Sequence, residues 1–104
     1  MKKYIQIQST FENREDAALM ATALLDARLV ACCRINEIEC FYDWKGERCE
    51  GKEFLLTTNT KADLYEECEK FIKARHPYET PLIVAVKVKY GNKEYEAWID
   101  GNVK

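Results

Sequence analysis

Hydrophobic and polar residues alternate with two different periods along the first quarter of the chain. Residues 4–9 alternate with a period of two and include two β-branched isoleucines, which predicts a strand. Residues 13–27 change to helical spacing, and Asn13 is a residue type that caps helices. We therefore expect a helix that ends near Ala27, with one buried stripe. The stripe consists of Ala17, Met20, Ala21 and Leu24.

The middle of the chain predicts a long β-hairpin. Residues 29–44 alternate as one strand and residues 47–58 as the next, and Lys45-Gly46 is a turn signal between them. The apolar positions change phase near Asn36, and a β-bulge at that point would explain the change.

A second helix is predicted after this hairpin. Residues 60–63 resemble a capping box, which favours a helix start. The helix must end by His76, because Pro77 disfavours a helical residue before it. Its expected buried stripe is Leu64, Cys68, Phe71 and Ile72.

The last third of the chain predicts a strand and a short helix. Residues 76–81 contain two prolines and form a stiff linker. Residues 82–88 are a strand whose continuous apolar start predicts burial on both faces. After a turn at Gly91, Asn92 can cap a helix with one apolar side. That side carries Tyr95, Trp98 and Ile99.

The predicted order is β-α-β-β-α-β with an additional C-terminal helix. This is the ferredoxin-like α+β sandwich, with two helices on one face of a four-stranded antiparallel sheet. The chain of 104 residues and 12.2 kDa has room for one core, so we expect one domain over 1–104.

The hairpin is too long for its own subunit. Residues 29–44 would stretch about 50 Å at ~3.3 Å per residue, whereas a domain of this size is roughly 30–35 Å wide. The far end carries Phe41, Tyr42 and Trp44, and an exposed aromatic tip is typical of an interface. We expect a closed oligomer in which each ribbon packs on, or extends, a neighbour's sheet. The alternative is a hairpin that bends back on its own sheet.

Composition and charge exclude several classes of function. Apolar residues make up 47% and charged residues 33%, and 16 Lys+Arg against 18 Asp+Glu give a net charge of −2. No basic excess favours nucleic acid or an anionic membrane surface. No apolar run approaches the ~20 residues that span a bilayer. Residues 1–6 lack the apolar region of a signal peptide, which predicts a cytoplasmic protein.

The five cysteines, at positions 32, 33, 40, 49 and 68, predict free thiols. Their number is odd and no Cys-x-x-Cys occurs, so neither a disulfide framework nor a zinc-finger spacing fits. A two-residue turn pairs 42 with 49, so Cys40 and Cys49 do not oppose one another. Small buried hydrophobic residues are one interpretation, and a soft metal ligand or redox-sensitive thiol is the other.

Several segments together resemble a known family. They are residues 27–32 (ARLVAC), 41–46 (FYDWKG), 53–56 (EFLL), 76–81 (HPYETP) and 95–99 (YEAWI). In this order, over nearly the whole chain, they resemble the CutA1 family of divalent-cation tolerance proteins. The Tyr-x-Trp-x-Gly hairpin followed by the His-Pro-Tyr linker is the most specific part.

The resemblance implies a ferredoxin-like subunit, a homotrimer, and tolerance of copper and other divalent metal ions. It implies no catalytic reaction and no organic cofactor. Copper-binding members take ligands from the end of the first strand and from a histidine pair before the Pro-Tyr. This chain has Ser9 at the first place and Arg75-His76 at the second. Arginine stays protonated and is unsuitable as a ligand.

The candidate metal ligands are His76, Glu79 and Cys32. His76 is the sole histidine, and it is either an imidazole ligand or a helix-terminal residue that interacts with the last carbonyls. Glu79 could add a carboxylate oxygen, and Cys32 a thiolate for Cu(I). The candidates for a trimer interface or intersubunit groove are Phe41, Tyr42, Trp44, Glu53, Tyr78 and Trp98.

Other proteins share the predicted fold, and fold alone does not choose between functions. An RNA-recognition module needs a basic aromatic third strand, and an acylphosphatase-type enzyme needs a glycine-rich phosphate loop; neither is present. The remaining alternative is a trimeric nucleotide or metabolite sensor that resembles the PII signalling family.

Overall fold

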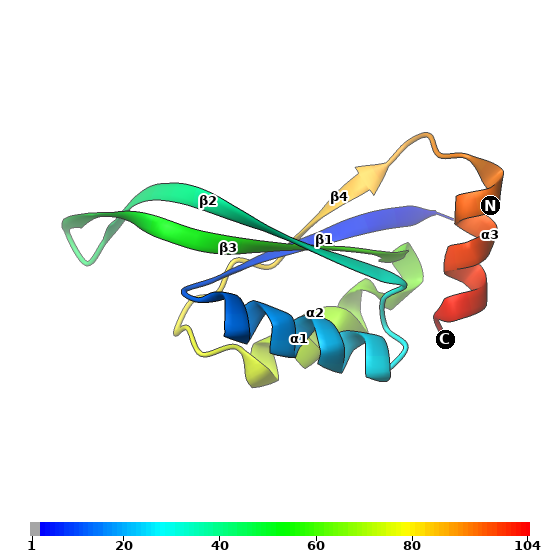
Figure 1. Cartoon of the computed structure of the whole chain (residues 1–104), viewed down its shortest axis with the longest axis horizontal. Helices are drawn as coiled ribbons and strands as arrows, with labels where there is room; N and C mark the ends of the chain where they lie inside the picture. The colour runs from blue at the N-terminus through cyan, green and yellow to red at the C-terminus, as the bar shows by residue number, and fades with distance from the viewer. Residues whose placement is uncertain (1–2) are drawn as a thin grey trace.

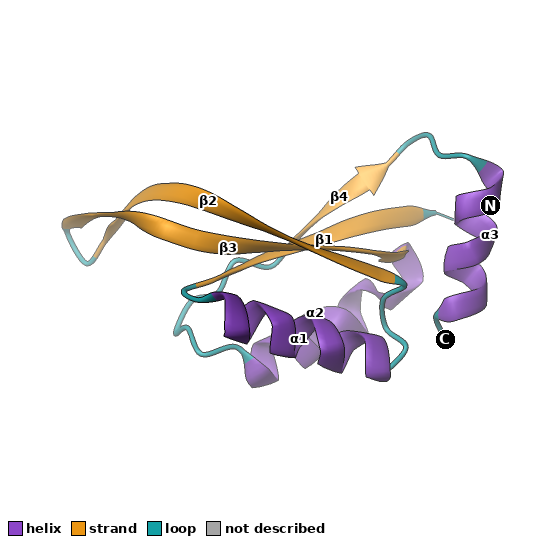
Figure 2. Cartoon of the chain, in the orientation of Figure 1, coloured by secondary structure: helices purple, strands orange, loops and turns teal. Residues whose placement is uncertain are grey.

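Four strands form one antiparallel sheet in the order β2-β3-β1-β4, and two helices lie against one of its faces (Figures 1 and 2). The structure is a computed structural model that describes residues 3–104; Met1 and Lys2, which begin the amino-terminal segment considered above, lie outside the described residues. The strands are β1 (Tyr4–Phe11), β2 (Cys32–Trp44), β3 (Glu47–Lys61) and β4 (Val84–Val88). The helices are α1 (Arg14–Asp26), α2 (Tyr65–Arg75) after a 3₁₀ turn (Ala62–Leu64), and α3 (Lys93–Asn102). The predicted ferredoxin-like order is confirmed.

Helix α1 is closed at both ends by local hydrogen bonds. The side chain of Asn13 accepts a bond of 2.8 Å from the amide of Asp16, so the predicted cap is confirmed. At the other end Arg28 has a φ of 58°, and the amides of Arg28 and Leu29 each donate a 3.0 Å bond to carbonyls of the last turn. Because Leu29 belongs to this C-terminal cap, β2 begins at Cys32 rather than at the predicted residue 29.

The hairpin has an unbroken register. Trp44 pairs with Glu47 across a two-residue turn, and the pairing continues without interruption to Cys32 and Asn59. The predicted bulge near Asn36 is therefore wrong. The apolar pattern changes face because Ile35 still packs on the helical layer, whereas the strand beyond it has left that layer.

The hairpin extends beyond the rest of the fold (Figure 1). Strand β1 pairs with β3 only from Phe54 to Lys61, so residues 47–53 pair with β2 alone. That free ribbon is about 20 Å long at ~3.3 Å per residue. The chain measures 45 × 25 × 21 Å with a radius of gyration of 14.3 Å, whereas a compact domain of this length has about 13 Å.

The core lies between the sheet and α1 and α2. Its fully buried members include Ile7, Phe11, Leu24, Leu56 and Ile72. A second small cluster holds α3 against the end of the sheet through Tyr4, Ala31, Ile99 and Val103. Within residues 3–104, none of the helices is long and apolar enough to span a membrane.

The start of the second helix differs from the prediction. Thr60 is buried in β3, and its hydroxyl donates a 2.6 Å bond to the carbonyl of Leu29 instead of capping a helix. The chain enters α2 through the 3₁₀ turn without a side-chain cap. The predicted end is confirmed, because α2 stops at Arg75 and the amide of His76 donates to the carbonyl of Ile72.

Strand β4 is exposed in this chain, which makes the prediction of burial on both faces wrong for the single subunit. Val84 and Val86 are 40% and 48% exposed. The reason is that Val84 and Val86 pair with Gln8 and Gln6 on the sheet face opposite α1 and α2, at the edge strand of the sheet. Asn92 precedes α3 at the predicted place, but its side chain contacts Glu94 and does not cap the helix.

Candidate functional site

His76, at the end of α2, contacts β1 through one ring nitrogen and the following linker through the other. Nε2 lies 2.9 Å from the backbone oxygen of Thr10, and Nδ1 accepts a 3.1 Å bond from the amide of Tyr78. A carbonyl oxygen can only accept, so the proton is on Nε2. The ring also stacks on Phe11 with centroids 4.3 Å apart.

Burial of the ring favours the neutral form of the imidazole. Burial lowers the pKa of His76, and the bond to Thr10 and the carboxylates of Asp16 and Glu53 offset only part of that effect. A metal ion could bind Nδ1 only if the Tyr78 amide gave up its acceptor. The ring therefore bonds to β1 and to the linker, and its hydrogen bonds do not include the last carbonyls of α2.

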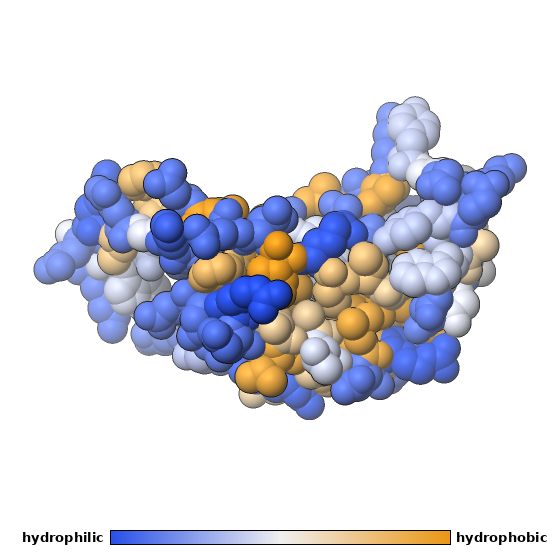
Figure 3. Space-filling model, in the orientation of Figure 1, coloured by the Kyte–Doolittle hydropathy of each residue, from blue (hydrophilic) through white to orange (hydrophobic). Residues whose placement is uncertain are grey.

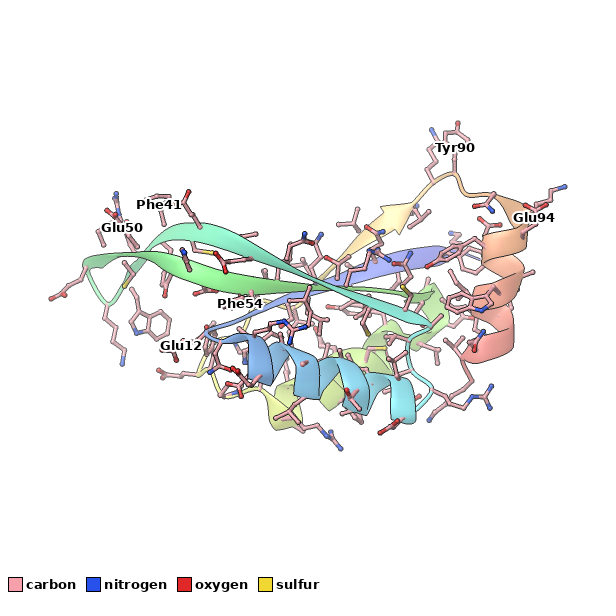
Figure 4. The ribbon with its side chains drawn as sticks, viewed as in Figure 1. Glu12, Phe41, Glu50, Phe54, Tyr90 and Glu94 are labelled. Carbon is pink, nitrogen blue, oxygen red and sulfur yellow. The ribbon has the colours of Figure 1, made fainter. Side chains whose placement is uncertain are left out.

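The free ribbon has two chemically different faces. The aromatic face carries Ile38, Cys40, Tyr42 and Trp44 from β2, opposite Glu53, Gly51, Cys49 and Glu47 from β3. The charged face carries Glu37, Glu39, Phe41 and Asp43, opposite Phe54, Lys52, Glu50 and Arg48. Ion pairs Arg48–Asp43 and Lys52–Glu37 cross the charged face. In Figure 4, Phe41 and Glu50 point away from the side where Glu12 lies. Phe41 is therefore separated from Tyr42 and Trp44 by the ribbon itself.

Glu53 is the centre of a negatively charged cluster on the aromatic face. Burial and then the nearby Glu53 carboxylate raise the pKa of the Cys40 thiol. Burial, followed by the carboxylates of Glu53 and Glu12, raises the pKa of Tyr78 to about 12. Burial and then Glu53 also raise the pKa of Tyr42. No described residue forms an ion pair with Glu53. The cluster therefore favours a cation and disfavours a phosphate.

Glu79 faces the tip of the hairpin. Its carboxylate lies 3.8 Å from the Lys45 ammonium, and both side chains are largely exposed. The same ammonium lies 5.6 Å from the centre of the Trp44 ring. Exposed ion pairs of this kind contribute little to stability, so Glu79 is held loosely.

Cys32 lies at the other end of the sheet, next to α3. Its sulfur accepts a 3.3 Å bond from Arg34, whose other terminal nitrogen donates a 2.6 Å bond to Asn59. Burial and then the nearby Cys32 thiol raise the pKa of Tyr95, and the Arg34 guanidinium lowers it in part. Trp98 stacks on Tyr95 with centroids 5.5 Å apart. Cys32 is thus part of a polar cluster that does not include His76 or Glu79.

The candidate metal ligands do not meet within one subunit. Across residues 3–104, no three side chains of His, Cys, Asp or Glu are grouped so that they could hold a metal ion. All five cysteines are free, and burial raises the pKa of Cys33 and of Cys68 to about 12. The donors of a single subunit therefore do not fit a bound divalent ion.

Some residues of these clusters were missed by the sequence reasoning. Glu12 follows the end of β1, and its approach to Tyr78 depends on the linker's path, which no periodicity encodes. The sequence does contain the signal that assigns residues to the two faces of the ribbon. Counting outward from the Lys45-Gly46 turn places Glu53 opposite Ile38.

Comparison with known families matches this geometry. The family model described as CutA1 divalent ion tolerance protein matches residues 5–102. The chain belongs to the CutA1 family. The resemblance of the hairpin and linker segments is thereby confirmed.

Curated CutA1 family proteins resemble the chain over almost its full length. A divalent-cation tolerance protein CutA of Thermotoga maritima is 41% identical over 103 residues, covering 95% of this chain and 98% of the relative. One of Pyrococcus horikoshii is 37% identical over 95 residues, covering 91% and 93%.

Solved CutA1 structures share the fold closely. CutA1 from Pyrococcus horikoshii superposes with a TM-score of 0.93 at 35% identity, covering 96% of this chain and 98% of that one. CutA1 from Oryza sativa gives 0.94 at 29% identity, covering 98% and 94%. The chain therefore resembles these proteins in sequence and in fold.

Proposed function

We propose that this CutA1 protein acts in divalent-cation tolerance as a homotrimer that binds divalent metal ions such as Cu²⁺ and catalyses no reaction. The observation that carries the proposal is the free ribbon, whose aromatic face is exposed where its own subunit ends.

Two exposed apolar surfaces support assembly. Tyr42 and Trp44 on the ribbon are exposed, and so are Val84 and Val86 on the β4 edge. An isolated two-stranded ribbon is marginally stable, and an unprotected edge strand rich in valine is an aggregation hazard. Packing of one copy's ribbon against the next copy's sheet removes both exposed surfaces from water, and a cyclic trimer closes that arrangement.

The negative cluster around Glu53 supports cation binding. Because one subunit does not group three suitable ligands, the proposed site draws donors from more than one subunit. Glu53 is the donor that we place there, since it lies on the aromatic face and lacks a cationic partner among the described residues. His76 would have to release the Tyr78 amide to join it.

Sedimentation equilibrium and metal titration test the proposal. We expect a trimer mass at micromolar concentration and Cu²⁺ binding by calorimetry. Glu53→Gln should weaken that binding, whereas Glu50→Gln on the charged face should not. A stable monomer would refute the assembly. Unchanged Cu²⁺ affinity in Glu53→Gln would remove Glu53 from the site. Thermal stabilisation by ATP instead of Cu²⁺ would favour the sensor resembling the PII family.

We also propose that the protein acts in the cytoplasm. Five free cysteines support a reducing compartment. A structural relative from Archaeoglobus fulgidus, 35% identical, is described as a periplasmic divalent cation tolerance protein. Cell fractionation with an antibody against the native chain would decide between the compartments.

A further inference from the structure

The side of α1 that faces away from the sheet is apolar where a surface helix usually carries charge. Residues 17–25 contain no charged side chain. Leu19 is 69% exposed and Leu25 is 42% exposed, on either side of Thr22. Figure 3 shows apolar side chains gathered over α1, between the polar hairpin and α3. A helix that is apolar on both sides is normally covered on both.

The middle of this outer face is made of small residues. Ala18 and Thr22 lie one turn apart, and the Thr22 hydroxyl donates a 3.0 Å bond to the carbonyl of Ala18. That bond satisfies the hydroxyl within the helix, so the methyl group of Thr22 is left for packing. Small residues at a crossing point let two helices approach closely, to about 8–10 Å between axes.

Opposite charges flank the apolar stretch. Arg14 begins α1 and Asp26 ends it, both are exposed, and neither forms an ion pair with any described residue. They are separated by about 18 Å along the axis at 1.5 Å per residue. Positions 14 and 26 are also equally distant from Met20, as are positions 18 and 22.

This arrangement is self-complementary. If a second α1 runs antiparallel with Met20 at the centre, Ala18 faces Thr22 of the second copy, and Arg14 faces Asp26 of the second copy at both ends. A two-fold axis repeats each contact. We propose that the outer face of α1 is a docking surface for α1 of a second copy, which links the assemblies formed through the ribbon into larger ones.

The size of the surface sets the strength of this contact. One helix pair buries less than the ~1,200 Å² of a standard stable interface, so a single contact is weak. Assemblies that present several copies of α1 bind through more than one contact and gain affinity by multivalency. Association should therefore appear only as concentration rises, above the mass of the basic assembly.

Charge exchange provides the sharpest test. We expect sedimentation velocity of the full chain to show a weight-average mass that rises with concentration above the basic assembly. Leu19→Glu should abolish the rise, and Arg14→Asp or Asp26→Arg alone should shift it to at least about ten-fold higher concentration. The double variant with both charge changes should restore it. Both charge changes agree with the helix dipole, so the helix should remain folded, and circular dichroism checks this.

Lys70→Glu on the exposed side of α2 is the control and should leave the rise unchanged. A wild-type mass that stays constant with concentration would overturn the proposal. So would a double variant that fails to restore association, since that result means that Arg14 and Asp26 of two copies do not face each other. Loss of the basic assembly itself belongs to the ribbon contact and is measured separately at low concentration.

Discussion

The Nε2 atom of His76 lies 2.9 Å from the backbone oxygen of Thr10, so a side chain at the end of α2 satisfies a backbone carbonyl near the end of β1. The other ring nitrogen holds the amide of Tyr78. One imidazole thus fixes the start of the linker, and with it the position of Tyr78 near Glu53.

Replacing this ring should destabilise the fold. His76→Ala removes two hydrogen bonds to buried or half-buried backbone groups and the stack on Phe11. We expect a loss of about 2–3 kcal/mol in the free energy of unfolding, measured by urea denaturation. Lys73→Ala on the exposed side of α2 is the control and should stay within about 0.5 kcal/mol. A loss no larger than that of the control would mean that the ring does not hold the linker.

Stability should depend on pH through the same ring. Burial lowers the pKa of folded His76 below its ordinary value of 6.5, so the unfolded chain binds more protons in this range. The stabilising contribution is therefore complete above the unfolded value and decreases as pH falls from there toward the folded value. Urea denaturation across this pH range measures the free energy of unfolding of the wild type and of His76→Gln. We expect this free energy to change less steeply with pH in the variant. Identical slopes would assign the pH dependence to other groups.

Local signals predicted most of the fold, and the failures have physical causes. The cap at Asn13, the two-residue turn at Lys45-Gly46 and the helix stop before Pro77 each depend on adjacent residues, and all are present. The predicted helix cap at Thr60 is wrong because its hydroxyl bonds instead to the buried carbonyl of Leu29, 31 residues away. The predicted burial of the β4 valines is wrong for this chain by itself. A continuous apolar run predicts that a strand is covered, but it does not indicate whether the cover comes from the same chain or from another one.

The candidate site was harder to predict for a related reason. His76 stands out in the sequence as the sole histidine, but its hydrogen-bond partners are backbone atoms that carry no sequence signature. Cys32 has the chemistry of a soft metal ligand, yet its sulfur contacts Arg34, two residues along the same strand face. Long-range contacts of this kind depend on register and on the linker path, which local patterns do not fix.

The two faces of the ribbon should contribute differently to assembly. Trp44 shares its face with Ile38 and Tyr42, whereas Phe41 lies between the ion pairs of the charged face. Trp44→Ala should therefore weaken the proposed trimer by about 2 kcal/mol or more, seen as dissociation at low concentration in light scattering. Phe41→Ala is the matched control and should have a smaller effect. A greater effect of Phe41→Ala would mean that the charged face is the one that contacts the neighbour.

Ser9 and Thr60 provide a paired test of the buried hydroxyl groups. Ser9 is almost fully buried and its hydroxyl has no hydrogen-bond partner among residues 3–104, whereas the Thr60 hydroxyl donates to Leu29. Ser9→Ala removes a polar group that folding strips of water without compensation, so it should raise the free energy of unfolding by about 1 kcal/mol. Thr60→Val keeps the shape but leaves the Leu29 carbonyl without this donor, and should lower it by about 1–2 kcal/mol. Urea denaturation measures both. A destabilised Ser9→Ala would show that a bound water satisfies the hydroxyl in solution, because only then would its removal cost a bond.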